Sequence, residues 1–199
     1  DEFRDPSGMV IDERDDILYV ADTENDRIKI YELTDGDNCP SGTVEIVNDE
    51  VCFVEEFGSS GSTDGKFNSP AGLAIDTAND LLYVADTGND RIRIFELTDG
   101  DNCPSGTEEV INDEVCFVDD FGSAGSNEGK FNEPSGLAFD EDNNLLYVAD
   151  TENDRIQVFE IVSGTTCPSG TDEVIDGVCF VEEFGSSGSG NGAFNSPSG

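Results

Sequence analysis

The residues best suited to chemistry in this sequence are acids, amides and arginines in one six-residue phrase. The phrase reads Asp-Thr-x-Asn-Asp-Arg and occurs three times, at residues 22–27, 86–91 and 150–155. Its oxygens could line a binding rim, or they could cap a turn while arginine pairs with a carboxylate. We favour the structural role for this turn or rim, whose residues are Asp22, Asn25, Arg27, Asp86, Asn89, Arg91, Asp150, Asn153 and Arg155.

A second acidic phrase, Thr-Asp-Gly-Asp-Asn, could hold a cation. Alternating carboxylate and amide oxygens suit calcium, a hard cation that binds oxygen ligands. However, no downstream glutamate stands at the EF-hand spacing, and residues 162–166 of the third copy lack the acids. Turn chemistry is therefore favoured and no cofactor is expected, with calcium as the alternative for Asp35, Asp37, Asn38, Asp99, Asp101 and Asn102.

The sequence offers little for catalysis. It contains no histidine, the side chain that most readily transfers protons near neutral pH. A catalytic centre brings unlike residues together, whereas the three copies of each phrase here are nearly identical. We therefore do not expect an enzyme.

These phrases belong to a long internal repeat. The tripeptide Pro-Ser/Ala-Gly begins at Pro6, Pro70, Pro134 and Pro197, at intervals of 64, 64 and 63 residues. The amino-acid sequence between these tripeptides is almost the same in each copy. Self-similarity at a fixed period indicates a repeat architecture.

Each copy predicts four short strands and no helix. In the middle copy the strands are 72–76, 81–85, 91–97 and 115–121, bounded by Asn, Asp and Gly turns. Residues 81–85 are apolar on both faces, which indicates a sheet covered on both sides. Four-stranded antiparallel sheets packed face to face around an axis meet that need, so the predicted fold is all-β, built of β-propeller blades.

The repeat resembles the NHL repeat. The resemblance rests on Pro-x-Gly-Leu-Ala-Ile-Asp, then Leu-Tyr-Val-Ala-Asp-Thr-Gly-Asn-x-Arg-Ile-x-x-Phe, then Phe-Gly-Ser-x-Gly, and it covers about two thirds of each copy. Two departures stand out. The unit is longer than the family's usual one, with the excess at residues 98–114 of the middle copy, and Asp26, Asp90 and Asp154 stand where the family often has His or Gln.

Cysteines bracket this excess, one pair per copy and 12 or 13 residues apart. We predict disulfides that close a long hairpin. Buried reduced thiols are the alternative, and a zinc site is disfavoured because no Cys-x-x-Cys spacing occurs. Disulfides imply an oxidising compartment, so we expect an extracellular or cell-surface protein. The predicted pairs are Cys39/Cys52, Cys103/Cys116 and Cys167/Cys179.

The resemblance implies three NHL-like blades, at residues 1–69, 70–133 and 134–199, the last including the start of a next repeat. A closed propeller needs about four to eight blades. The expected partners are therefore further copies of the chain, as a homo-oligomer or polymer, or flanking repeats of a longer chain. We predict an extracellular structural protein that assembles by blade stacking, with a fibre as one form of it. The alternatives are a cell-surface propeller that binds protein or glycan, and a calcium-dependent, lactonase-like enzyme.

Charge narrows the partners further. The net charge is −37, from 46 acidic and 9 basic residues, so nucleic acid and anionic lipid surfaces are disfavoured. No stretch approaches the about 20 apolar residues of a membrane span. The linking segment at 57–67 and its copies carry hydroxyls that could bear an O-linked glycan.

Overall fold

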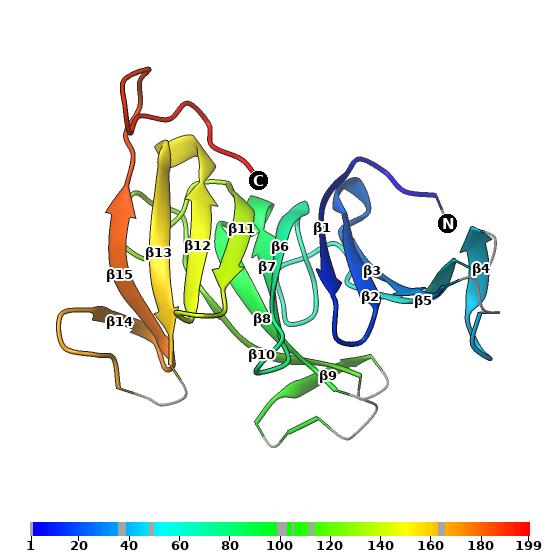
Figure 1. Ribbon diagram of the computed structural model, residues 1–199. Coiled ribbons are helices and arrows are strands. Elements are labelled where there is room, and N and C mark those ends of the chain that lie inside the picture. The colour runs from blue at the N-terminus through cyan, green and yellow to red at the C-terminus, as the bar shows by residue number, and fades with distance from the viewer. Residues whose placement is uncertain are drawn as a thin grey trace.

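The computed structural model contains three β-sheets of one design, each with five antiparallel strands (Figure 1). The structure describes residues 2–35, 39–47, 50–98, 103–104, 106–111, 114–162 and 166–199. The first sheet, blade 1, contains β1 (Pro6–Asp12), β2 (Ile17–Asp22), β3 (Arg27–Leu33), β4 (Val44–Val47) and β5 (Val51–Phe57).

Blades 2 and 3 repeat this arrangement. Blade 2 contains β6 (Pro70–Asp76), β7 (Leu81–Asp86), β8 (Arg91–Leu97), β9 (Glu108–Ile111) and β10 (Val115–Phe121). Blade 3 contains β11 (Pro134–Asp140), β12 (Leu145–Asp150), β13 (Arg155–Ile161), β14 (Asp172–Ile175) and β15 (Val178–Phe184). A single 3-10 turn joins the second and third strands of each blade: η1 (Thr23–Asn25), η2 (Thr87–Asn89) and η3 (Thr151–Asn153).

The prediction of four strands per blade was wrong by one. The fifth strand, β9 in blade 2, lies in the excess segment 98–114, where we predicted a hairpin but no separate strand; it pairs with β10 and forms the outer edge of the sheet. Thr98 N donates to Glu114 O at 2.9 Å, which closes the base of this hairpin. Edge strands need no continuous apolar pattern, and β9 begins with two glutamates, so its composition resembles that of a loop.

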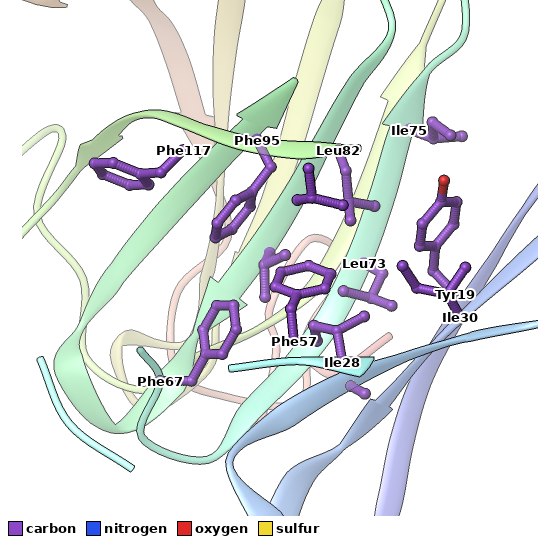
Figure 2. Close-up of a cluster of buried hydrophobic side chains, with 13 residues drawn as sticks. Tyr19, Ile28, Ile30, Phe57, Phe67, Leu73, Ile75, Leu82, Phe95 and Phe117 are labelled. Atoms are coloured by element: carbon purple, nitrogen blue, oxygen red, sulfur yellow. The ribbon is translucent and has the colours of Figure 1, made fainter. Parts of the chain in front are cut away.

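Apolar side chains fill the space between neighbouring blades. Figure 2 shows the contact of blade 1 with blade 2, to which blade 1 contributes Tyr19, Ile28 and Phe57 and blade 2 contributes Leu73, Leu82 and Phe95. The rings of Phe57 and Phe95 pack with their centroids 5.2 Å apart. An equivalent cluster joins blade 2 to blade 3. The middle blade is thus covered on both faces, as the apolar pattern of residues 81–85 predicts.

The innermost strands β1, β6 and β11 lie side by side, and glycine permits their closest approach (Figure 1). A Cβ atom on Gly72 would lie 2.1 Å from the carbonyl oxygen of Ser135, and one on Gly8 would lie 2.0 Å from that of Ala71. Real Cβ atoms do not approach oxygen so closely. The glycine of the Pro-Ser/Ala-Gly phrase is therefore required by the packing of one blade's inner strand on the next.

Candidate functional site

The predicted turn residues form a buried network in each blade. In blade 2, the fully buried carboxylate of Asp86 accepts hydrogen bonds from Asn68 N (2.8 Å), Asn89 Nδ2 (2.9 and 3.0 Å) and Arg91 Nε (2.8 Å). Arg91 also pairs with Asp120 on β10 at 3.0 Å. Every oxygen of this carboxylate is therefore engaged inside the protein.

The other two blades build the same network. Asp22 binds Asn25 and Arg27, and Asp150 binds Asn153 and Arg155, while these arginines also reach Glu56 and Glu183 on the last strand. Burial by itself would raise the pKa of Asp22, but hydrogen bonds from the Arg4 amide, Asn25 and Arg27 outweigh it and hold that pKa below its ordinary value. All nine turn residues take part in these networks.

Two further residues of each phrase bind the neighbouring blade, a role that the sequence interpretation missed. Thr23 Oγ1 donates to Pro70 O at 2.8 Å, and Asp26 Oδ1 accepts from Ser69 N at 2.7 Å. Asp26 has a left-handed backbone (φ 55°), which Asp tolerates. The same bonds recur from Thr87, Asp90, Thr151 and Asp154. The turn therefore joins one blade to the next.

A buried polar position on the third strand was also missed. It holds Lys29, Arg93 and Gln157 in the three blades. Arg93 donates to Asp86 Oδ2 at 3.1 Å and to Thr63 O at 2.8 Å, and its guanidinium lies 5.1 Å from the Phe117 ring centroid. The residue type changes in every copy, which is why comparison of the copies did not single it out.

The three predicted cysteine pairs are joined as disulfides: Cys39–Cys52, Cys103–Cys116 and Cys167–Cys179. Each joins the segment before the edge strand to the last strand of the blade, and so closes the outer hairpin that these two strands form. In blade 2 this hairpin reaches back to the linker of blade 1, where Val110 lies against Gly65, and in blade 3 Val174 lies against Gly129 in the same way. The hairpin is thus part of the contact between blades.

The calcium alternative falls mostly outside the described residues. Asp35 is described and exposed, whereas Asp37, Asn38, Asp99, Asp101 and Asn102 are not among the described residues. Within the described ranges, no three acidic or cysteine side chains converge as metal ligands would. In the same part of the chain, no helix has the length and apolar character needed to cross a membrane.

The first blade has one uncovered face. Met9 is 73% exposed, whereas its equivalent in blade 2, Leu73, is 5% exposed because blade 1 covers it. Ile46 on the outer hairpin is 55% exposed and corresponds to Val110, which packs on the preceding linker. Around these side chains lies an apolar hollow of about 300 Å³, lined by Phe3, Met9, Leu18, Val20, Tyr31 and Ile46.

The third blade has the complementary uncovered face. Phe184 on β15 is 47% exposed, and its equivalent in blade 2, Phe121, is 2% exposed. Phe121 packs on Phe131 of the following linker and on Phe159 of the next blade. Phe184 has the linker contact, with Phe194, and has no next blade in the described structure. The two open faces are therefore the two halves of a contact that occurs twice inside the chain.

Comparison with known proteins agrees with this architecture. The NHL repeat family matches residues 3–31, 67–95 and 131–159. Human NHL repeat-containing protein 2 is 32% identical over 194 residues, which cover 91% of this chain and 25% of the human protein. The chain thus spans about a quarter of the length of that relative.

Solved structures share the fold at low identity. A candidate 6-phosphogluconolactonase from Bacteroides fragilis has a TM-score of 0.54 at 13% identity, over 89% of this chain and 42% of that one. The periplasmic gluconolactonase of Pseudomonas aeruginosa has a TM-score of 0.52 at 11% identity, over 89% and 41%. At these identities the likeness concerns the fold alone.

Proposed function

Because the chain belongs to the NHL-repeat family, we propose that it is a binding and assembly segment whose two open faces each receive a further blade of the same kind. The added blades come from flanking repeats or from another chain. In this role the chain is structural and holds its neighbours by stacking sheets. Continued stacking closes a ring where the rotation permits and otherwise extends a fibre.

The observation that carries this proposal is the equivalence of the covered and uncovered faces. Residues 64 positions apart lie in the same place on successive blades, yet Met9 is open where Leu73 is buried. Burial of one large apolar side chain contributes about 1.5–3 kcal/mol, so covering each face supplies a substantial driving force for association. What covers the face of blade 2 inside the chain is another blade, and this supports the same occupant for the open faces.

Residues 194–199 support a next blade after blade 3. They hold the position that residues 67–72 and 131–136 hold before blades 2 and 3. Pro197 O accepts the hydroxyl of Thr151 at 2.8 Å, and Ser196 N donates to Asp154 at 2.8 Å. Residues 196 and 197 thus bind blade 3 as their equivalents before blades 2 and 3 bind the blade that precedes them, which supports a next blade at this place.

We further propose that this assembly is extracellular or at the cell surface. Three disulfides, one in each blade, support this location, because such bonds persist in oxidising compartments. The strongly acidic surface is compatible with it, since like charge keeps assembled material dispersed.

The proposal is tested by adding a fourth blade to the chain, next to the open face of blade 3. A chain extended after Gly199 by a copy of residues 73–133 continues the repeat in phase. We expect its unfolding free energy to rise, and the amides of β13 and β15 to exchange more slowly with deuterium. The control is the same extension with aspartate at its copies of Leu82 and Val84, which belong to the face that meets the preceding blade. If the unaltered extension folds but protects blade 3 no better than the control does, the proposal is wrong.

A further inference from the structure

The loops between the first and second strands of each blade make polar contacts between neighbours. Counted from the last residue of the strand before them, they are residues 12–16, 76–80 and 140–144. Arg14, Thr77 and Glu141 of these loops line a hollow together with residues of the inner strands. The third position of these loops differs in every blade: it is Arg14, Ala78 and Asp142. The second position is Glu13, Thr77 and Glu141, and the fifth is Asp16, Asp80 and Asn144.

The first loop of blade 1 binds the first loop of blade 2 through the guanidinium of Arg14. Arg14 Nη1 donates to the carbonyl oxygen of Thr77 at 2.6 Å, and Arg14 Nη2 pairs with Asp80 Oδ1 at 2.5 Å. The hydrogen bond to Asp80 raises the pKa of Arg14 further above its ordinary value. In this contact the third position of one loop reaches the second and fifth positions of the next.

The first loop of blade 2 binds the first loop of blade 3 through an uncharged donor, Thr77. The hydroxyl of Thr77 donates to Glu141 Oε1 at 2.5 Å, and the Thr77 amide donates to the same oxygen at 3.2 Å. These bonds hold the pKa of Glu141 below its ordinary value. Here the second position of one loop meets the second position of the next, and again a donor faces a carboxylate.

Continued from blade 3 onto blade 1 of a second identical copy, the same contacts would join like charges. Glu141 would meet Glu13, and Asp142 would meet Asp16. Arg14 of that copy would already be held by Asp80 and Thr77 of its own chain. All four acids are exposed, and the hydrogen bonds from Thr77 favour the charged form of Glu141. Juxtaposed like charges discriminate against a partner.

We propose that these loops select which blade follows which, and that the open face of blade 3 fits a blade with an uncharged or basic first loop in preference to blade 1 of an identical chain. This inference rests on the proposed assembly function and adds the chemistry of the partner. The apolar faces supply adhesion that any NHL-like blade shares, and the loops supply the discrimination.

The test is self-association of the 199-residue chain, measured by sedimentation equilibrium at low and high salt. Asp142→Arg places a cation where Arg14 stands in blade 1. The double variant Glu13→Thr, Asp16→Asn removes the acids from the other side, and asparagine tolerates the left-handed backbone of Asp16. At low salt we expect each to associate at least about tenfold more tightly than the wild type, with high salt narrowing the difference.

The matched control is Asp119→Arg, the same charge change at an exposed position of β10 in the middle blade. It corrects for the lower net charge, and we expect it to follow the wild type. If the wild type or the control associates as tightly as Asp142→Arg, the inference is overturned while assembly by stacking stands. If no variant associates at any salt concentration, the inference is overturned too. Whether blades stack is then decided separately by hydrogen exchange in the chain extended after Gly199.

Discussion

The carboxylate of Asp86 accepts the Nε–H of Arg91 at 2.8 Å although the Asp86 side chain is completely buried. The same carboxylate also binds Arg93, which is itself fully buried. Two arginines of blade 2 thus share one buried carboxylate. This relationship makes Asp86 the residue whose loss should be least tolerated.

We expect Asp86→Ala to lower the unfolding free energy by about 3–5 kcal/mol, because it leaves the fully buried Arg93 without its carboxylate partner, whereas Arg91 keeps its ion pair with Asp120. Urea denaturation followed by circular dichroism measures the change. Asp119→Ala, at an exposed site, should alter the unfolding free energy by no more than about 0.5 kcal/mol. Equal effects of the two substitutions would contradict the structural role of the turn.

A matched pair of phenylalanines reports on the open face. Phe121→Ala should cost about 3–5 kcal/mol, because it empties a packed position between blades 2 and 3. Phe184→Ala should cost below about 1 kcal/mol in the 199-residue chain, because the side chain is already half exposed. In the chain extended by one blade, the cost of Phe184→Ala should approach that of Phe121→Ala. A cost that stays low in a folded extension would show that the added blade does not cover this face.

The disulfides should stabilise the contact between blades as well as the hairpins. Replacing Cys103 and Cys116 together by alanine is expected to cost about 3 kcal/mol in the chain-entropy model. Because Val110 of this hairpin lies on the linker at Gly65, hydrogen exchange should quicken in both β9 and residues 58–66. Faster exchange in β9 with an unchanged linker would show that the hairpin does not help to hold blade 1.

Stability should depend on pH through Asp22. Its folded pKa lies below the unfolded value of about 3.9, so its contribution is present above that pH and is lost as the pH falls through the folded pKa. The wild type should therefore exceed Asp22→Asn in unfolding free energy at pH 6 by more than it does at pH 2 to 3. A difference that is constant over this range would show that the ionised form is not preferentially bound. The comparison between two variants cancels the effect of general acid titration.

The main strands could be predicted because their signal is local. Residues 91–97 and 115–121 are strands within the predicted bounds, and the faces of residues 81–85 are both covered. Alternating or continuous apolar residues between Asn, Asp and Gly turns carry that information within a few positions. The family resemblance then supplied the arrangement of the sheets.

The bonds between blades carry no local signal. Asp26 binds the amide of Ser69, and Thr23 binds the carbonyl of Pro70, more than forty residues away. In sequence these residues are an ordinary polar turn, and only the stacking of sheets brings their partners near. Strand β9 escaped prediction for another reason, because its edge position and its glutamates give it the composition of a loop.

The turns of blades 2 and 3 bind the segments on both sides of their blades, and this has a consequence for folding. In blade 2, Arg91 binds Ser62 of the linker before it, whereas Asp90 binds Glu133 of the linker after it. An interior turn is therefore complete only when the segments on both sides are in place. In arrays with this nearest-neighbour coupling, each added unit stabilises the unit before it, and the terminal units unfold first.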